Sequence, residues 1–332
     1  MVLLKNDLCL QLILRLEESS ERTPAVPKDT AQNIMALKYV VVDVFTKEKF
    51  AGNQLAIVEI GSQSLTKDEK QMIAKEFNYS ETTFYQPVGT STFNVDIFTP
   101  DQELPFAGHP TIGTAVHLLS TQKTQGPTIT GVFNLKAGRV ELEYDVAQQT
   151  AKAAIPHNVH IHRALCDSAE MMKLQPKLGR VPSQSPVVSI VKGMTFVLAE
   201  LDSQDTLTFV NTTSHTLQIP LDDGTTETFI GCYFYYRLPE GEDGITRLRT
   251  RMIESSIGED AATGSAACTL ACYLTVQQRK AGTTSKYLIT QGVEMGRRSD
   301  IGVDVTTTSK GEIEKVTLSG SAVQIMAGTL TL

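Results

Sequence analysis

Two segments of this sequence combine small residues with the start of an expected helix, and each could bind a negative charge. They are LPFAGHPTIGTAVHLL (104–119) and GEDAATGSAACTLACYL (258–274). The first amides of a helix are unpaired and carry a partial positive charge. Small residues such as Gly108 and Gly264 let a ligand approach that backbone closely. Two such ends facing one cleft would hold a carboxylate or stabilise an enolate oxygen. The alternative is that the small residues only allow two buried helices to pack closely.

Three ionisable side chains could supply acid–base chemistry to such a cleft: Glu81 in YSETTF, His109 in the first segment and Asp260 in the second. One carboxylate can both take and return a proton, and partial burial is expected to raise the pKa of Glu81 and strengthen it as a base. Each residue also has an ordinary explanation. A glutamate at the start of a strand is usually solvated, and Asp260 could simply be an acid near a helix N-terminus. Only their combination indicates an active site.

The elements that must position these residues are mostly short strands. The sequence TKDE from Thr66 to Glu69 predicts a capped helix, and two more helices are expected, one from about Pro110 and one over residues 263–274. Strands are predicted at 38–46, 55–60, 82–86, 92–98, 132–135, 139–144, 187–191, 195–198, 229–236 and 245–252, with further strands from residue 287 to the end. This is a mixed α/β (α+β) pattern.

The two glycine-containing segments have the same design, which suggests two similar domains. Matching Ala107 with Ala261 places them about half a chain apart. We therefore predict a first domain over residues 37–150 and a second over 151–332, with the last strands able to return to the first. Residues 1–36 are predicted to be a disordered extension, because residues 22–34 are polar and contain two prolines.

Composition argues against several classes of partner. The net charge of −7, with no basic cluster, argues against nucleic acid and anionic membrane surfaces. The apolar run at residues 8–16 is interrupted by Gln11 and Arg15 and is too short to span a bilayer. The five cysteines match no disulfide framework and no C-x-x-C metal motif. We expect reduced thiols and a cytoplasmic protein.

Three histidines cluster just beyond the expected domain boundary: His157, His160 and His162. In an extended chain His160 and His162 share a face and His157 points away. We interpret this stretch as a solvated linker rather than a metal site, and we predict no bound metal. The spacing of Gly108 and Gly113 is that of a P-loop, but no lysine follows, so nucleotide binding is not indicated.

Four motifs, in this order and spacing, resemble the phenazine-biosynthesis-like (PhzF-like) family: DVFTKEKFAGNQLAIV (43–58), SETTF (80–84), DIFTPDQELPFAGHPTIGTA (96–115) and GEDAATGSAA (258–267). The resemblance runs from about residue 37 to the end and is densest in the first half. It implies a fold similar to diaminopimelate epimerase, with two similar domains, each a strand-rich roll or barrel around a central helix. That epimerase has a cysteine base at each helix N-terminus. The matching positions here, Ala107 and Ala261, cannot move a proton.

The resemblance also implies an isomerase that needs no cofactor and acts on a small cyclic or conjugated carboxylate, such as trans-2,3-dihydro-3-hydroxyanthranilate. Glu81 would remove a carbon-bound proton and return it elsewhere on the same substrate face. The residues implied to bind the substrate are His109, Asp260, Ser265, Gly108, Asn53 and Gly264. Family members are commonly dimers, so a homodimer is expected. Ala261 stands where the family usually has proline, which leaves the identity of the substrate open.

Two other functions stay open on the sequence alone. The first is an epimerase or racemase that uses Glu81 together with a second base. The second is a non-catalytic protein that binds a small molecule in the same cleft, although the joint presence of Glu81, His109, Asp260 and Ser265 argues against it.

Overall fold

The computed structural model describes residues 36–225 and 229–332. The expected extension, residues 1–36, therefore lies outside the described residues except for Ala36, which begins the first strand. Residues 37–330 form one compact unit, and the account below concerns this unit. None of the helices in the described part of the chain is both long enough and apolar enough to cross a membrane.

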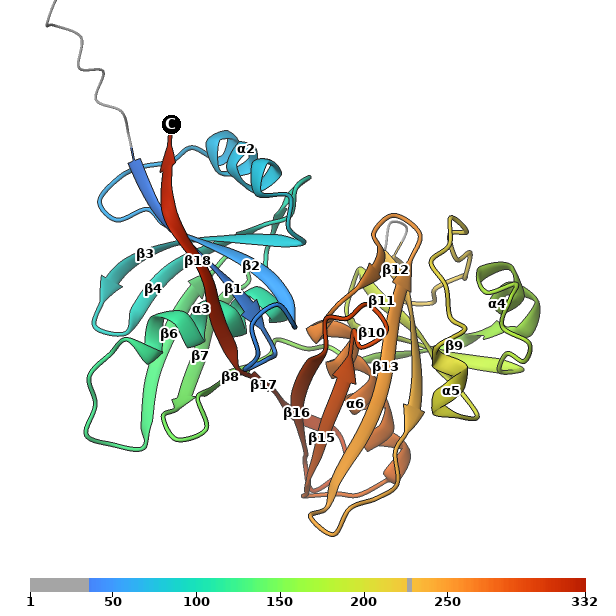
Figure 1. Cartoon of the computed structure of the whole chain (residues 1–332). Coiled ribbons are helices and arrows are strands. Elements are labelled where there is room, and N and C mark those ends of the chain that lie inside the picture. Colours follow the sequence, from blue (N-terminus) through green and yellow to red (C-terminus); the bar gives the residue numbers. More distant parts are fainter. Residues whose placement is uncertain (1–35, 226–228) are drawn as a thin grey trace, which may run out of the picture. The chain divides into compact units, whose positions relative to one another are not determined.

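The first half of this unit arranges eight strands about one long buried helix (Figure 1). Its elements are β1 (Ala36–Val44), β2 (Asn53–Glu59), α2 (Lys67–Phe77), β3 (Glu81–Gly89), β4 (Thr92–Phe98), β5 (Glu103–Leu104), α3 (Gly108–Ser120), β6 (Thr128–Leu135), β7 (Gly138–Asp145) and β8 (Thr150–Ala154). The predicted capping box of α2 is present, because Thr66 Oγ1 accepts from Glu69 N and Glu69 Oε2 accepts from Thr66 N.

The second half repeats the plan around another buried helix, α6. Its elements are β9 (His160–Asp167), α4 (Ser168–Leu174), β10 (Gln184–Val191), β11 (Met194–Glu200), α5 (Gln204–Leu207), β12 (Phe229–Arg237), β13 (Ile245–Glu254), β14 (Gly258–Asp260), α6 (Gly264–Gln278), β15 (Thr284–Gln291), β16 (Ser299–Thr307) and β17 (Ile313–Gly320). The last strand, β18 (Ala322–Thr331), lies beside the strands of the first half (Figure 1). The short helices α4 and α5 are absent from the sequence-based prediction.

Strand pairing connects the two halves. In the first half, parallel pairing of β2 and β3 places Glu81 beside Leu55, so the glutamate stands at the beginning of its strand. Late in the chain, β17 pairs with β16 and also with β8, and β18 pairs with β1. Residue 150 begins β8, which is paired to β7 and β17. The division into domains at this point stays a prediction.

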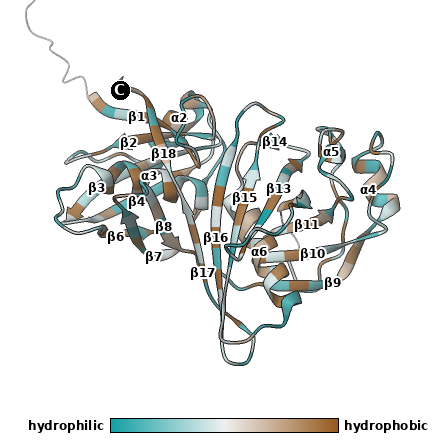
Figure 2. Ribbon diagram, turned by 60° about the horizontal axis from the view of Figure 1, so that its bottom comes forward, coloured by the Kyte–Doolittle hydropathy of each residue, from teal (hydrophilic) through white to brown (hydrophobic). Residues whose placement is uncertain are grey.

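The two central helices are apolar on almost all sides because strands surround them. Eleven of the thirteen residues of α3 are buried, and so are ten of the fifteen residues of α6. Small residues are required there, since a Cβ atom on Gly113 would lie 2.6 Å from Val44 and 2.7 Å from Leu55. In β16 every second residue is buried, and hydrophobic and hydrophilic residues alternate along the strand (Figure 2).

The interpretation of residues 157–162 as a solvated linker is wrong. His160 begins β9, and this strand pairs with β10 over several residues. His162 is buried in the sheet. Ile161 and Leu165 lie on the exposed face of β9, so the strand lacks the usual alternation of buried apolar and exposed polar residues. For this reason the sequence pattern does not indicate a strand here.

Candidate active site

Glu81 and His109 form a shielded acid–base pair. Glu81 is the first residue of β3 and His109 the second residue of α3. The Oε2 atom of Glu81 lies 3.0 Å from Nδ1 of His109, and the two side chains are 18% and 4% exposed. The carboxylate therefore keeps partial access to solvent while its histidine partner has almost none.

The second ring nitrogen of His109 is buried without a hydrogen-bond partner among the described residues. Buried polar atoms in native proteins nearly always have a partner, in the protein or in water or a ligand. Because ionised Glu81 can only accept hydrogen bonds, Nδ1 carries the ring proton. In the neutral ring Nε2 is then an acceptor, suited to a substrate O–H or N–H group.

Asp260 is held by contacts from both halves of the chain. Asn53, at the start of β2, donates from Nδ2 to Asp260 Oδ1 at 2.8 Å and to the carbonyl of Ala262 at 3.2 Å. Thr263 donates its hydroxyl to Asp260 Oδ2 at 2.7 Å. Asn53, from the first half of the chain, thus holds Asp260 of the second half in place.

The helices α3 and α6 begin side by side. A Cβ atom on Gly108 would lie 3.6 Å from Gly264 Cα and 2.6 Å from Leu318 Cδ2, so this close approach requires glycine. Neither N-cap residue, Ala107 or Thr263, caps its helix through its side chain. The first-turn amides of both helices therefore lack the usual side-chain acceptor, and they can donate to an anion.

The helix starts also correct one sequence-based match. By position in the helix, Gly108 corresponds to Gly264, and Ala107 to Thr263 rather than to Ala261. The half-buried Ser265 then takes the place of His109. The alignment by alanines is therefore wrong by two residues.

The two carboxyl groups of the site have pKa values shifted in opposite directions. Burial alone would raise the pKa of Glu81, but hydrogen bonds from His109 and Ser80, together with the charge of His109, outweigh it and lower the pKa. The expectation of a raised pKa for Glu81 is therefore wrong. Burial and the nearby charge of Glu81 raise the pKa of Asp260 to about 6. Environments that separate two carboxyl pKa values are typical of sites with distinct acid and base roles.

The buried thiols of α6 do not replace the missing bases of the epimerase. Burial raises the pKa of Cys272 to about 12 and that of Cys268 well above its usual value. Both stay protonated at neutral pH and pack in the core. Cys268 and Cys272 are thus small buried residues of the core.

Sequence reasoning missed the residue that ties this loop together, Gln291 at the end of β15. Its amide contacts the carbonyl of Asp260, both the hydroxyl and the amide of Thr263, and the hydroxyl of Tyr233. The one local signal is that Gln291 precedes a glycine, Gly292, which in the structure has a positive φ and marks the end of the strand. A single sequence gives no further signal for a buried glutamine.

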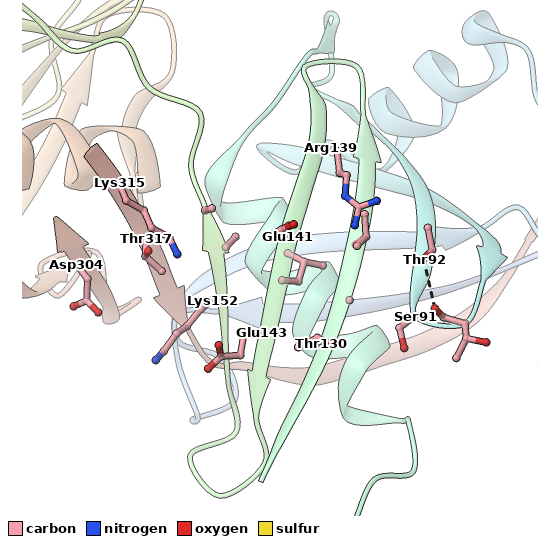
Figure 3. Close-up of a pocket in the computed structure, with 16 residues that line it drawn as sticks. Ser91, Thr92, Thr130, Arg139, Glu141, Glu143, Lys152, Asp304, Lys315 and Thr317 are labelled. Carbon is pink, nitrogen blue, oxygen red and sulfur yellow. Dashed lines mark hydrogen bonds between the residues drawn. The ribbon is translucent and has the colours of Figure 1, made fainter. Parts of the chain in front are cut away.

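A pocket of about 620 Å³ lies elsewhere, over strands β6, β7, β8 and β17 (Figure 3). Charged side chains such as Arg139, Glu143 and Lys152 line it. None of the expected site residues is among its lining, so the site described above is defined by the contacts of Glu81, His109 and Asp260 and not by this hollow.

Comparison with known proteins agrees with the motifs. Residues 42–328 match the family model described as "Phenazine biosynthesis-like protein". An uncharacterised isomerase of Mesorhizobium japonicum is 29% identical over 88% of this chain and 98% of its own length. A trans-2,3-dihydro-3-hydroxyanthranilate isomerase of Pseudomonas fluorescens is 30% identical over 89% of this chain and 99% of its own length.

Solved structures share the fold. A PhzF-family phenazine biosynthesis protein of Bacillus anthracis superposes with a TM-score of 0.69 at 18% identity, covering 90% of this chain and all of that one. A hydroxyproline epimerase of Agrobacterium vitis gives a TM-score of 0.58 at 12% identity, covering 90% of this chain and 93% of that one. At these identities the likeness concerns the fold alone, and the predicted fold class is confirmed.

Proposed function

The chain belongs to the phenazine biosynthesis-like family and is an isomerase, and we propose that it moves a carbon-bound proton within a small cyclic or conjugated carboxylate without a cofactor. The substrate resembles trans-2,3-dihydro-3-hydroxyanthranilate, the compound in the name of the P. fluorescens relative. The observation that carries the proposal is the 3.0 Å contact of Glu81 with His109, whose other nitrogen is buried and unpartnered among the described residues.

Glu81 acts first as base and then as acid. Its lowered pKa keeps it ionised at neutral pH, so it is ready to take a proton. Burial is the largest single effect on the pKa of Glu81, and it raises that pKa. A bound substrate covers the exposed part of the carboxylate and so increases this effect. The protonated form is thereby stabilised long enough to return the proton to another carbon.

His109 orients Glu81 and binds the substrate. Its Nδ1–H donates to the carboxylate, which fixes the ring, and the buried Nε2 accepts from a hydroxyl or amino group of the substrate. When Glu81 takes the proton, Nδ1–H of His109 still donates to the Glu81 carboxyl group. No further group is required for the transfer.

The starts of the two central helices hold the charged end of the substrate. The amides at Gly108, Gly264 and Ser265 begin the two helices and would bind its carboxylate. Charge that develops in the conjugated system during proton removal is then stabilised by fixed dipoles. Asp260, kept in place by Asn53 and Thr263, faces the polar substituents.

An epimerase or racemase is the second candidate, because one observation favours it. Asp260 has a pKa of about 6, near the range in which a group can both give and take a proton. Solvent deuterium separates the two mechanisms. A two-base enzyme exchanges the substrate proton with water. When Glu81 alone shifts the proton, a fraction of the product molecules keeps the substrate's own proton.

The test is a proton NMR time course with trans-2,3-dihydro-3-hydroxyanthranilate and three proteins: the wild type, Glu81→Gln and Glu76→Gln. Glu76 is a matched control because it is an exposed glutamate on α2. Loss of a general acid–base group is expected to slow turnover by about 10²–10⁴-fold, and Glu76→Gln should match the wild type. Equal turnover by Glu81→Gln would refute the role of Glu81. If no protein turns over this compound, the substrate is a different carboxylate.

The proposal also covers assembly and location. We propose a homodimer on the family resemblance, which light scattering coupled to gel filtration would test. The cytoplasmic location rests on the thiols, since Cys166, Cys232, Cys268 and Cys272 are free and buried.

A further inference from the structure

Two histidines of one strand meet an aspartate of a distant loop, and none of the three belongs to the network of Glu81, His109 and Asp260. His160 and His162 lie two residues apart on β9, so their side chains share one face of the strand. Their ring centroids are 4.6 Å apart. Asp222, between α5 and β12, places its Oδ1 atom 2.8 Å from His160 Nε2 and 2.8 Å from His162 Nδ1.

The environment of His162 is that of a fixed ligand. Its side chain is fully buried, and its Nε2 atom lies 2.8 Å from the hydroxyl of Ser189. Ser189 is buried and contacts Thr195 in turn. A histidine that binds a metal usually donates its other ring N–H to such a partner, which sets the tautomer. Without an ion, His162 Nδ1 lies 2.8 Å from Asp222 Oδ1 and donates its proton to that carboxylate. A metal ion would displace this proton, and with Nε2 protonated toward Ser189 the Nδ1 lone pair would bind the ion.

We propose that His160, His162 and Asp222 bind a divalent transition-metal ion, zinc by preference. One ligand atom from each residue lies within 4.8 Å of the other two. Around a tetrahedral ion with bonds of roughly 2.0–2.2 Å, ligand atoms are about 3.3 Å apart. Small rotations of the partly exposed His160 and Asp222 open the present 2.8 Å contacts to that spacing.

The donor set selects the class of metal. Two imidazole nitrogens and one carboxylate oxygen suit zinc and its neighbours, whereas calcium and magnesium prefer oxygen ligands alone. Three protein ligands leave a fourth position for water, and the 43% exposure of His160 leaves a path for the ion to enter. Bound metal would fasten the loop that carries Asp222 to β9.

The same atoms can also associate without an ion, as imidazole N–H groups donating to a carboxylate. Arg163 adds a competing positive charge, with its Nε atom 3.7 Å from Asp222 Oδ2. Its side chain is 95% exposed and free to move away when a cation binds. The experiment must therefore separate a metal site from a purely hydrogen-bonded cluster.

The experiment measures Zn²⁺ binding to the full chain at neutral pH by isothermal titration calorimetry. The wild type should bind one ion per chain. Loss of an outer partner typically costs about 10–100-fold in affinity, so Ser189→Ala should fall in that range. His160→Gln and Asp222→Asn remove ligands and should lose at least about 100-fold. Because both residues are partly exposed, these variants should keep the wild-type circular dichroism spectrum.

Two controls exclude other binding sites. His157→Gln removes a neighbouring histidine outside the cluster, and Glu81→Gln removes the acidic group of the proposed active site; both should retain wild-type affinity. The absorption spectrum of a Co²⁺ complex should lack thiolate charge-transfer bands. The proposal is overturned if the wild type shows no saturable Zn²⁺ binding, if His160→Gln and Asp222→Asn bind as tightly as the wild type, or if the cobalt spectrum shows thiolate ligation.

Discussion

Replacement of Gln291 by leucine tests how the second loop of the site is held. Gln291 is fully buried. Its Nε2 atom donates to the Asp260 carbonyl at 2.8 Å and to Thr263 Oγ1 at 3.0 Å. Its Oε1 atom accepts from the Tyr233 hydroxyl at 2.9 Å and from Thr263 N at 3.2 Å. One side chain thus forms hydrogen bonds with polar groups of β12, of β14 and of the loop before α6.

The expected loss of stability follows from the groups left behind. Leucine has a similar volume but leaves the Asp260 carbonyl, the Thr263 amide and the Tyr233 hydroxyl without this partner. A buried unsatisfied polar group costs about 1–3 kcal/mol, so three would cost roughly 3–9 kcal/mol. Tyr233 keeps its contact with Thr250, and leucine adds apolar contact, so the lower end, about 3 kcal/mol, is expected. Unfolding free energies are typically about 5–15 kcal/mol, so the variant still folds.

Urea denaturation measures this loss, and the turnover of the folded variant measures its effect on the site. The matched control is Gln175→Leu, another buried glutamine, which bonds only to the backbone of Asn211. Asn211 is exposed, so water replaces those bonds and a loss of about 1 kcal/mol is expected. Turnover should fall in Gln291→Leu alone, because Thr263 and Asp260 lose their support. Equal losses of stability and unchanged turnover would refute the reasoning.

The remaining predictions concern charged residues. In Glu81→Gln the pKa of Asp260 should fall from about 6, because the charge of Glu81 adds to burial in raising it. A raised carboxyl pKa stabilises the folded state at acid pH, and this stabilisation is lost as the pH rises from about 3.8 through 6. Asp260→Asn should therefore flatten that part of the profile of stability against pH. Carboxyl NMR titration checks the pKa of Asp260, and urea melts at several pH values check the stability profile. Arg297→Leu leaves Asp43 buried without its cation, at a cost of about 3–5 kcal/mol in urea melts. Arg298→Leu, which removes an exposed pair, should cost at most about 1 kcal/mol, and similar losses in the two would contradict this account.

Local patterns in the sequence were sufficient for the elements that carry strong signals. The capping box at Thr66 marks α2, and the small-residue segments mark the starts of α3 and α6. The meeting of Glu81 with His109 is different, because it depends on the parallel pairing of β2 with β3 and on the place of α3 against those strands. Spacing along the chain does not encode that geometry. In the sequence, only the family resemblance indicates that Glu81 and His109 belong to one site.

The failures have a common physical origin in contacts between distant segments. The pKa of Glu81 was expected to rise because burial can be judged from sequence, but the opposing hydrogen bond from His109 cannot. The histidines of β9 were interpreted as a linker because Asp222, their partner, is about sixty residues away. Gln291 was missed for the same reason. Each of these three errors lies in a contact that only the fold creates.

The two helix starts also bear on the choice between a one-base and a two-base mechanism. Their backbones are equivalent, with Gly108 matching Gly264, but their side chains are not, since Ser265 occupies the position of His109. Four residues before each helix the second half has Asp260 and the first has Leu104. The site therefore combines one carboxylate that is paired with a histidine and has a lowered pKa with a second carboxyl that is held by Asn53 and Thr263 and has a raised pKa. Interchangeable bases require similar environments, whereas this asymmetry favours one group that moves the proton and another that binds the substrate.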